Sequence, residues 1–205
     1  MNLQIGTRGL RFYPDHLSRE AQMAVLVALR GVLAKAQLFT PRMPKSGRPM
    51  SVGMSNCGPL GWISDERGYR YQCLHPDTGQ PWPAIPDLLL QLWGEVARYP
   101  HVPEACLINY YGPNAKMGLH QDRDEAALDA PVLSISLGDD AIFRIGGTTR
   151  RSPTRRFTLR SGDAVVFGGV ARLAYHGIDR TIANSCSLMP GGGRINLTLR
   201  RVSPF

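Results

Sequence analysis

The stretch RINLTLR, residues 194–200, alternates polar and apolar side chains without a break. In an extended chain successive side chains point to opposite faces, so this alternation predicts a β-strand with one polar and one aliphatic face. Two interpretations are open: an edge strand with solvated arginines, or a strand whose arginines point into the interior of a β-roll. The polar face carries Arg194, Asn196, Thr198 and Arg200, and the aliphatic face carries Ile195, Leu197 and Leu199.

The second half of the chain contains further runs of the same kind. After residue 104 these short runs are rich in β-branched and aromatic residues, and Gly, Pro, Asn or Asp separates them. Such spacing is typical of an antiparallel sandwich or jelly roll. The runs are ACLINYY (105–111), PVLSISLG (131–138), AIFRIGG (141–147), RRFTLRSGDAVVFGG (155–169) and RLAYHG (172–177).

Two segments in the first half have a helical period instead. Residues 18–35 begin with Ser18, a favourable N-cap residue, and predict an amphipathic helix to about Lys35. Residues 86–98, PDLLLQLWGEVAR, predict a second helix that Tyr99-Pro100 ends. Most of the Pro, Gly and aromatic residues between them lie in residues 40–83, where we expect loops, short strands and room for a lid.

These patterns predict one domain over residues 1–205. A chain of 205 residues with 43% hydrophobic composition is long enough for one substantial core. We expect an α+β fold in which the front helices buttress one face of a β core over residues 104–205.

The charge of the chain favours a polyanionic partner. The formal net charge is +8 and the sequence pI is about 9.7. Six arginines and no acid lie between Arg144 and Arg160. The alternative is a basic face that is merely solvated.

Targeting and cysteine patterns indicate a soluble, cytoplasmic protein. We find no stretch of the roughly 18 apolar residues that a membrane span needs, and the N-terminal stretch lacks the apolar core of a secretory signal. The cysteines are scattered without a CxxC pair, which fits neither a disulfide framework nor a zinc finger. We expect reduced, mostly buried thiols at Cys57, Cys73, Cys106 and Cys186.

The stretch GLHQDRDE, residues 118–125, raises the possibility of a metal site. His120 and Asp122 are two residues apart, so in an extended segment both can approach one ion. His176, which lies 56 positions further on, could supply a second imidazole. Two histidines and one carboxylate on one face leave positions open for O2 and a chelating cosubstrate on Fe(II). Alone, the His-x-Asp pattern is weak.

The strand 194–200 supplies independent evidence for such a cosubstrate. Two guanidinium groups pointing into a β-roll beside an iron site would hold a dicarboxylate, because arginine pairs with carboxylates in a planar bidentate geometry.

Together these motifs resemble the AlkB family of Fe(II)- and 2-oxoglutarate-dependent demethylases of alkylated nucleic acids. The resemblance runs from about residue 45 to the end, and its motifs occur in the right order. They are MSVGMSNCGPLGW (50–62), PWPAIP (81–86), ACLINYYGPNAKMGLHQDRDE (105–125), YHGI (175–178) and RINLTLR (194–200).

The resemblance implies a role for each site residue. His120, Asp122 and His176 match the iron ligands, and the 2-oxoglutarate pocket is assigned to Asn109, Tyr111, Arg194 and Arg200, with Asn196 and Thr198 of the same strand face. The substrate-recognition positions are Trp62, Tyr69, Tyr71, Asp124 and Arg150. It further implies a double-stranded β-helix (jelly-roll) core over 104–205 and a nucleotide-recognition lid over 41–83, and we assign residues 1–40 to an N-terminal extension and helix from their own pattern.

Some positions depart from the family pattern. Phe167 stands where the family has a tryptophan, and Ile195 follows the first arginine where an aromatic residue is usual. The region before residue 40 matches poorly, and PGGGR (190–194) resembles a reshaped loop. These departures concern pocket shape and substrate range more than the type of reaction.

The implied reaction is oxidative demethylation of N1-methyladenine and N3-methylcytosine in DNA, with RNA as a further substrate. It uses Fe(II), 2-oxoglutarate and O2, and it releases formaldehyde, succinate and CO2. We expect a monomer that prefers single strands, since a base is then easily removed from its stack, although duplexes remain possible.

Two residues acquire substrate roles in this interpretation. Trp62 would stack on the target base opposite His120, and the carboxylate of Asp124 would favour a cationic methylated base. The alternatives are that Trp62 is a core aromatic residue and that Asp124 pairs with Arg123 or Arg150. For the whole chain the alternatives are hydroxylation of a tRNA wobble base or a protein side chain, and a non-catalytic module that binds iron and 2-oxoglutarate as signals.

Overall fold

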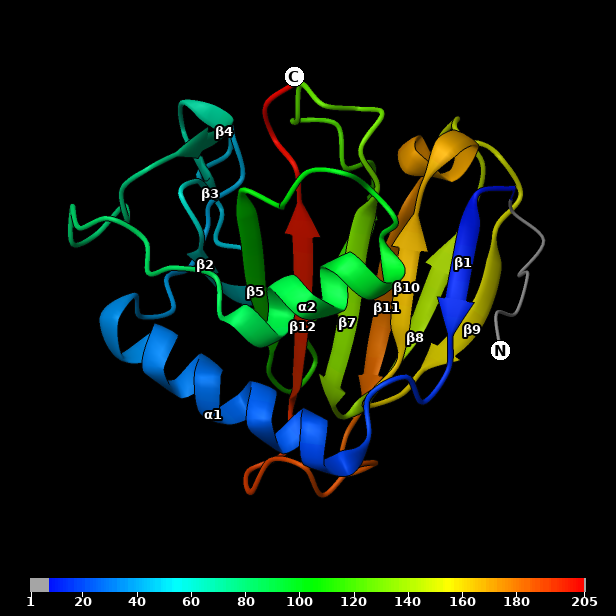
Figure 1. Cartoon of the computed structure of the whole chain (residues 1–205). Helices are drawn as coiled ribbons and strands as arrows, with labels where there is room; N and C mark the ends of the chain where they lie inside the picture. The colour runs from blue at the N-terminus through cyan, green and yellow to red at the C-terminus, as the bar shows by residue number, and fades with distance from the viewer. Residues whose placement is uncertain (1–7, 205) are drawn as a thin grey trace.

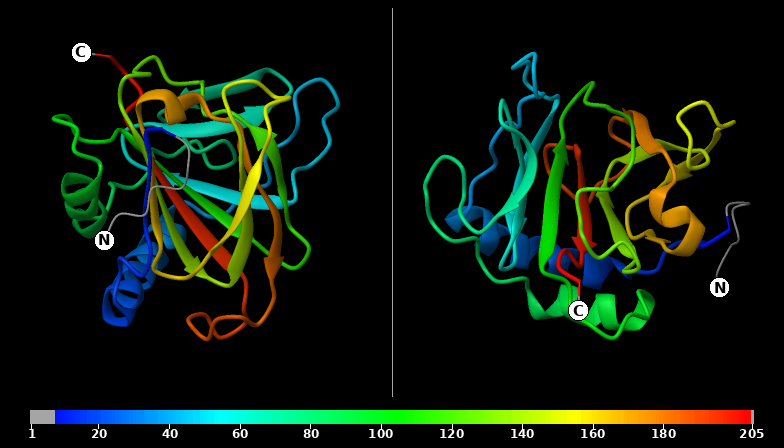
Figure 2. Two further views of the ribbon diagram at one scale, coloured as in Figure 1. Left: turned by 90° about the vertical axis from the view of Figure 1, so that its right-hand side faces the viewer. Right: turned by 90° about the horizontal axis from the view of Figure 1, so that it is seen from above.

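In the computed structural model, which describes residues 8–204, two antiparallel sheets face each other and form a roll (Figures 1 and 2). The larger sheet has six strands in the order β1-β10-β7-β12-β5-β2, and the smaller has four in the order β6-β11-β8-β9. The larger comprises β1 (Leu10–Tyr13), β2 (Val52–Cys57), β5 (Ala105–Tyr111), β7 (Val132–Gly138), β10 (Ala164–Phe167) and β12 (Arg194–Arg200). The smaller comprises β6 (Met117–His120), β8 (Asp140–Ile145), β9 (Arg155–Leu159) and β11 (His176–Ile182).

The strand β12 lies between β5 and β7 inside the larger sheet. Its aliphatic residues Ile195, Leu197 and Leu199 belong to the core cluster that also contains apolar residues of both helices. Its polar face is turned the other way, with Arg194 and Arg200 only 0% and 6% exposed. The strand prediction is therefore confirmed, and the alternative of an edge strand with solvated arginines is wrong.

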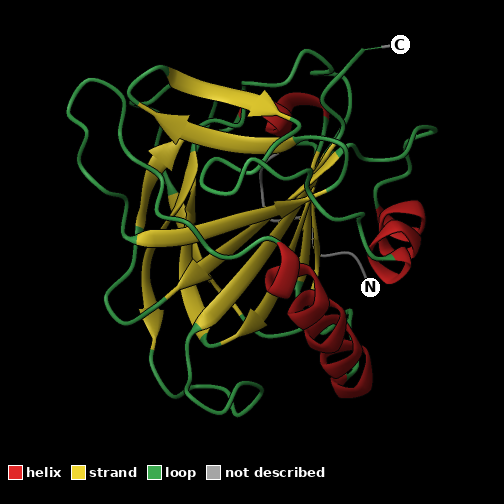
Figure 3. Ribbon diagram, turned by 90° about the vertical axis from the view of Figure 1, so that its left-hand side faces the viewer, coloured by secondary structure: helices red, strands yellow, loops and turns green. Residues whose placement is uncertain are grey.

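Both predicted helices are present, and they lie on the same side of the strand core (Figure 3). The helix α1 spans Arg19–Lys35, and the hydroxyl of Ser18 accepts a hydrogen bond of 3.2 Å from the Ala21 backbone N–H, as expected of an N-cap. The helix α2 spans Asp87–Val96 after Pro86. In the described part of the chain no helix is long and apolar enough to cross a membrane.

Two edge strands of the larger sheet come from the first half of the chain. β1 pairs with β10 at one edge, and β2 pairs with β5 at the other. The strand core therefore extends beyond residues 104–205, to which the sequence pattern assigned it. A run of four residues such as β1 is too short for its period to be recognised, and pairing with β10 stabilises it as a strand.

The hairpin of β3 (Gly61–Asp65) and β4 (Gly68–Gln72) forms a separate two-stranded sheet beside the roll (Figure 1). Gly68 has a φ of +109°, which L-residues with side chains rarely adopt, and it allows the tight turn. Within the region predicted as a lid, residues 41–83, this hairpin and its flanking loops stand outside the two main sheets, whereas β2 belongs to the core.

The run RLAYHG is not a strand, contrary to the expectation from sequence. Gly169–Leu173 form a short 3-10 helix, η1, and the strand β11 begins only at His176. Gly169 has a φ of +51°, which turns the chain away from the extended conformation of β10. The turn places His176 at the first position of β11.

Candidate metal centre and anion pocket

The two candidate histidine ligands are brought together by the register of the smaller sheet. His120 is the last residue of β6 and His176 is the first residue of β11, and the two are direct partners across these antiparallel strands. Their ring centroids are 4.5 Å apart. The proximity of residues 56 positions apart in the sequence is therefore a consequence of strand pairing.

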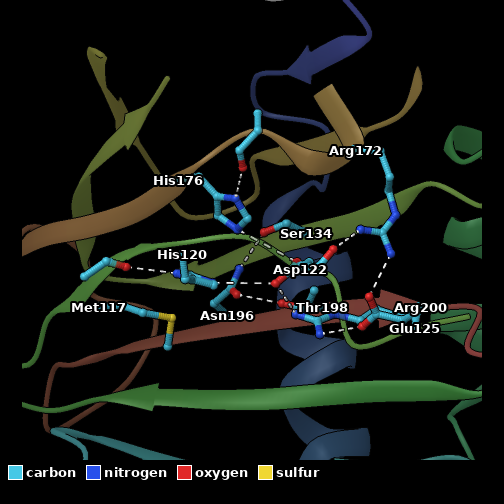
Figure 4. A network of polar contacts seen from close by, with 12 residues as sticks. Met117, His120, Asp122, Glu125, Ser134, Arg172, His176, Asn196, Thr198 and Arg200 are labelled. Atoms are coloured by element: carbon cyan, nitrogen blue, oxygen red, sulfur yellow. Dashed lines mark hydrogen bonds and ion pairs between the residues drawn. The ribbon is translucent and has the colours of Figure 1, made fainter. Parts of the chain in front are cut away.

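Asp122 completes the cluster from the loop that follows β6. Its Oδ1 lies 3.6 Å from Nε2 of His120, and its Oδ2 lies 3.8 Å from Nε2 of His176. One ligand atom from each residue lies within 4.8 Å of the others, a spacing at which one metal ion could bind all three. Figure 4 shows the three side chains converging beside the polar face of β12.

Backbone carbonyls hold both imidazole rings in the orientation of a metal ligand. Nδ1 of His120 lies 2.9 Å from the Gly118 oxygen, and Nδ1 of His176 lies 2.9 Å from the Ala174 oxygen. Since a carbonyl only accepts, each Nδ1 carries the proton and donates it, which leaves the Nε2 lone pairs directed at Asp122. The donor set of two Nε2 atoms and a carboxylate fits a divalent transition metal such as Fe(II).

Charges around the cluster favour the ligand forms of Asp122 and His176. Burial by itself would raise the pKa of Asp122, but the Arg200 guanidinium and the two histidines hold it well below its usual range. Burial and the neighbouring His120 lower the pKa of His176 to about 4, so its ring is neutral at pH 7. Although burial opposes it, Asp122 raises the pKa of His120, so a metal ion would compete with a proton there.

Candidate donors for an anion lie further along the polar face of β12. Arg194 is opposite Tyr111 in the register of β12 and β5. One guanidinium nitrogen of Arg194, Nη2, donates to the Ser136 hydroxyl over 2.9 Å, whereas its buried Nε and Nη1 have no partner among the described residues. Burial raises the pKa of Tyr111 to about 12, so its hydroxyl stays protonated. Unpaired guanidinium donors beside a protonated phenol fit a carboxylate ligand.

The middle residues of the polar face are bonded to one another and to β7. Asn196 donates to the Ser134 hydroxyl over 2.8 Å, and Thr198 donates to the Asn196 side-chain oxygen over 3.0 Å. Asn109 is opposite Asn196 in the strand register, and its buried Oδ1 has no partner among the described residues.

Arg200 is in a different situation from Arg194. Its guanidinium lies 2.8 Å from the carboxylates of both Asp122 and Glu125, and it donates to the Tyr71 hydroxyl over 3.0 Å. Only its Nε is without a partner among the described residues. In this structure Arg200 thus binds both Asp122, one of the three candidate metal ligands, and the neighbouring Glu125.

The predicted substrate residues gather on the hairpin β3–β4 and the adjacent loop. The rings of Trp62 and Tyr69 are stacked, with centroids 5.5 Å apart and an interplanar angle of 17°. The indole N–H of Trp62 donates to Asp124 over 2.8 Å. Asp124 is therefore bonded to Trp62 and not to Arg123 or Arg150, and half-buried Trp62 lies on the hairpin rather than inside the roll.

Tyr71 and Arg150 contact different partners from these residues. Tyr71 is opposite Trp62 in the hairpin, but its hydroxyl donates to Glu125. Arg150 donates to the Leu119 carbonyl over 2.9 Å, and its guanidinium carbon lies 5.9 Å from the centroid of the Tyr175 ring. Arg150 is thus held next to the strand that ends at His120.

The two departures from the family pattern lie in different places. The ring of Phe167 is buried, with its centroid 4.8 Å from that of His176, so it forms part of the wall behind the metal cluster. Ile195 belongs to the core cluster on the helix side of β12. Because alternation turns it away from the pocket, Ile195 does not line the anion site.

Sequence reasoning missed two buried residues of the site, Glu125 and Arg172. Glu125 ends the stretch 118–125, but nothing in the sequence distinguishes it from a solvated acid. Arg172 lies in a run that was interpreted as a strand. A basic residue four positions before His176 was the only available signal, and it is not specific.

Comparisons with known proteins agree with this geometry. Residues 9–200 match the family model described as 2OG-Fe(II) oxygenase superfamily. The chain is 53% identical over 195 residues to an alpha-ketoglutarate-dependent dioxygenase AlkB homolog of Caulobacter vibrioides, covering 94% of this chain and 87% of that protein. It is 47% identical over 169 residues to alpha-ketoglutarate-dependent dioxygenase AlkB of Escherichia coli, covering 80% and 76%.

Structural similarity extends over almost the whole chain. The solved structure of OsALKBH1 superposes with a TM-score of 0.82 at 27% identity, covering 98% of this chain and all of that one. Over about half of this chain, more distant relatives are named DNA N(6)-methyladenine demethylase ALKBH1D, from Arabidopsis thaliana at 39% identity, and tRNA demethylase abh1, from Schizosaccharomyces pombe at 33% identity. The chain covers 24% of the first of these two proteins and 37% of the second.

Replacing Asp122 should remove metal binding. Asp122→Ala deletes one of three converging ligands together with its negative charge, so affinity for Co(II) should fall by more than the roughly 10- to 100-fold typical of changes outside a ligand set. Titration followed by visible absorption measures it, with Asp122→Asn as a variant of the same shape. Asp129→Ala, an exposed acid of the same loop that accepts a hydrogen bond from Tyr99, is the control. Wild-type affinity in both Asp122 variants would exclude this residue as a ligand.

Proposed function

The chain belongs to the AlkB family of 2OG-Fe(II) oxygenases, and from this premise we propose that it removes methyl groups oxidatively from the ring nitrogens of nucleobases. Dependence on Fe(II) and 2-oxoglutarate follows from the family. The observation that carries the proposal is the His120–Asp122–His176 cluster together with Arg194, a buried arginine whose Nε and Nη1 have no partner among the described residues.

The assignment of the cofactors to residues follows the chemistry of the donors. His120, Asp122 and His176 would hold Fe(II), and Arg194 and Tyr111 would hold a carboxylate of 2-oxoglutarate. When bound together, the two cofactors supply oxidation of the methyl carbon by O2, with 2-oxoglutarate leaving as succinate and CO2. The hydroxylated methyl group then leaves the base nitrogen as formaldehyde. The chain itself orients the reactants and keeps bulk water away.

Asn109, Asn196, Thr198 and Arg200 complete the proposed cosubstrate site in different ways. Asn196 and Thr198 bond to each other and to β7, so they hold the floor of the pocket. Asn109 offers an unpaired amide oxygen. Arg200 holds the carboxylate of Asp122 and would add positive charge near an anionic ligand.

The hairpin β3–β4 is the proposed binding site for the target base. Trp62 and Tyr69 already lie parallel, which is the geometry in which aromatic side chains stack on a base that has left its own stack. Asp124 is exposed, and its carboxylate accepts from Trp62 through one oxygen, Oδ2. The other oxygen remains available for the exocyclic amino group of a cationic methylated adenine or cytosine. This hairpin and its loops form the lid of the proposed single domain.

The arginine-rich segment would meet phosphates of the same strand. Arg150 is held at the end of β6, one residue from His120, and the side chains of Arg151, Arg155, Arg156 and Arg160 are exposed. Phosphate contacts of this kind give affinity without reading base sequence. The proposed substrate is single-stranded, because a target base in a single strand need not be unpaired first. We further propose that the chain acts as a monomer in the cytoplasm.

Turnover of methylated oligonucleotides tests the proposal directly. The purified chain with Fe(II), 2-oxoglutarate and ascorbate should convert N1-methyladenine and N3-methylcytosine to the unmodified bases, with one succinate formed per methyl group, measured by mass spectrometry. DNA and RNA oligonucleotides of the same sequence would rank the two substrates. Consumption of 2-oxoglutarate with no change in any methylated oligonucleotide would refute the proposal.

Asp124→Ala should discriminate between cationic and neutral bases on the same panel. Because the variant loses a negative charge beside the base, activity on N1-methyladenine and N3-methylcytosine should fall by about 10-fold or more, as expected for a charged hydrogen bond of about 1.5–3 kcal/mol. Activity on the neutral N1-methylguanine and N3-methylthymine should fall less. Trp62→Phe removes the same Trp62–Asp124 hydrogen bond but keeps the carboxylate, so it is the matched control. Equal losses on all four bases would assign Asp124 a purely structural role.

Arg194→Lys should raise the concentration of 2-oxoglutarate needed for half-maximal turnover. An ammonium group is a point charge that cannot replace the bidentate fork of a guanidinium group. Affinity for Co(II) should change little, because Arg194 does not contact the metal cluster. The requirement is measured as succinate formation against 2-oxoglutarate concentration, and an unchanged requirement would place Arg194 outside the cosubstrate site.

Binding of an unmodified single-stranded oligonucleotide should weaken as salt is added. If about three phosphates are engaged, log affinity should fall against log salt with a slope of roughly −2. Fluorescence anisotropy over a range of salt concentrations measures it, and Arg151→Ala with Arg155→Ala should make the slope shallower. A flat response in the wild-type chain would show that the arginines do not face the nucleic acid.

A further inference from the structure

The position of Asp122 is not set by the sheet that positions the two histidines. His120 and His176 are direct partners in the ladder of β6 and β11. The strand β6 ends at His120, and Asp122 lies two residues beyond it in a segment without regular secondary structure up to residue 130. Some other contact must therefore hold this segment against β11.

The side chain of Arg172 makes that contact. All three of its guanidinium nitrogens donate to the segment of residues 122–130: Nε to the Ala130 carbonyl over 2.8 Å, Nη1 to the Asp122 carbonyl, and Nη2 to the Glu125 carboxylate over 2.8 Å. Arg172 belongs to η1, only four residues before His176. One buried side chain thus connects the backbone of one proposed ligand to the segment that leads into another (Figure 4).

Glu125 holds Arg172 in this orientation. Its side chain is 0% exposed, and its Oε2 accepts from Arg172 while its Oε1 accepts from Arg200 over 2.8 Å and from Tyr71. Arg200 in turn contacts the carboxylate of Asp122 over 2.8 Å. Asp122 is therefore held twice, by Arg172 through its backbone and by Arg200 through its side chain.

Stability alone does not account for this arrangement. The cluster buries the guanidinium groups of Arg172 and Arg200 with the carboxylates of Asp122 and Glu125, and the desolvation of such groups often cancels their attraction. Apolar residues of similar volume would often serve a core as well. What apolar residues would not provide is two hydrogen bonds to backbone carbonyls at chosen points of an irregular segment.

We propose that Arg172, oriented by Glu125, is a positioning residue that holds Asp122 at the distance from His120 and His176 that metal binding requires. This inference rests on the proposed function, in which these three residues bind Fe(II). Arg172 does not touch the metal cluster with its own side-chain charge, and its effect passes through the backbone of Asp122.

The test is the affinity and the visible spectrum of Co(II) bound to Arg172→Met, measured without substrate. Methionine keeps most of the length and apolar contact of the arginine stem but removes all three hydrogen bonds. Because Asp122 then keeps only the contact of its carboxylate with Arg200, Co(II) affinity should fall by about 10- to 100-fold, as is typical when partners outside the ligand set are lost, and the absorption bands should shift. Glu125→Gln, which keeps the shape of the side chain but removes its charge and one of its two accepting oxygens, should produce a smaller change in the same direction.

The matched control is Arg11→Met. Arg11 is a partly buried arginine of β1 whose guanidinium donates to a backbone carbonyl, that of Ala97, over 2.9 Å. Its replacement should lower the thermal stability of the metal-free chain without changing Co(II) affinity or spectrum. If Arg172→Met does not fold, Arg172→Lys is used instead. A single ammonium group cannot donate to all three acceptors of the Arg172 guanidinium, which are the Asp122 and Ala130 carbonyls and the Glu125 carboxylate.

The outcomes separate this inference from the proposed function. Wild-type Co(II) affinity and spectrum in folded Arg172→Met or Arg172→Lys, with binding still lost in Asp122→Ala, would overturn the positioning role alone. Failure of the wild-type chain to bind Co(II) through Asp122 would overturn the proposed function and this inference with it.

Discussion

Two guanidinium groups buried inside a β-roll are the constraint on which the rest of this molecule depends. Arg194 and Arg200 lie on one face of the central strand β12 and are 0% and 6% exposed. A buried charge without a partner costs about 3–5 kcal/mol, so each must be compensated nearby. Asp122 and Glu125 compensate Arg200, whereas among the described residues the Arg194 guanidinium donates only to the hydroxyl of Ser136. The unpaired Nε and Nη1 of Arg194 are donors that the proposed anionic cosubstrate would satisfy.

The three candidate metal ligands, His120, Asp122 and His176, are positioned by two kinds of contact. Strand pairing sets the two histidines against each other, and carbonyls two residues before each ring orient them. Asp122 comes from an irregular segment and depends on side-chain contacts, with Arg200 at its carboxylate and Arg172 at its backbone. Backbone pairing sets the histidines and is altered little by a change of side chain, whereas Asp122 depends on the side chains of Arg172 and Arg200. Variation in the loop contacts is therefore expected to tune metal binding more readily than variation in the strands.

The elements proposed for substrate binding lie outside the two sheets. The hairpin β3–β4 forms its own small sheet, and its Tyr69 is 47% exposed. Tyr71 connects this hairpin to Glu125, which also contacts Arg200 and Arg172. A base held by the hairpin would thus lie at one end of a continuous set of hydrogen bonds that reaches Asp122. A change in the hairpin would therefore reach the proposed metal ligand Asp122 through Glu125 and Arg200.

The sequence by itself determined the elements whose pattern is local. Alternation over residues 194–200 predicted β12 and its two faces, the Ser18 cap and helical period predicted α1, and the resemblance of the motifs around His120 and His176 to a known family predicted three residues that the structure brings together. Tertiary structure alone decided what depends on contacts between distant segments. β1 is a strand because β10 pairs with it, Trp62 rather than an arginine bonds to Asp124, and Arg172 and Glu125 became site residues only when η1 packed against the loop after β6. The hydrophobic period of a helix or strand shows which of its faces is buried. A buried ion pair produces no such pattern in the sequence, because its two partners come from segments that only the fold brings together.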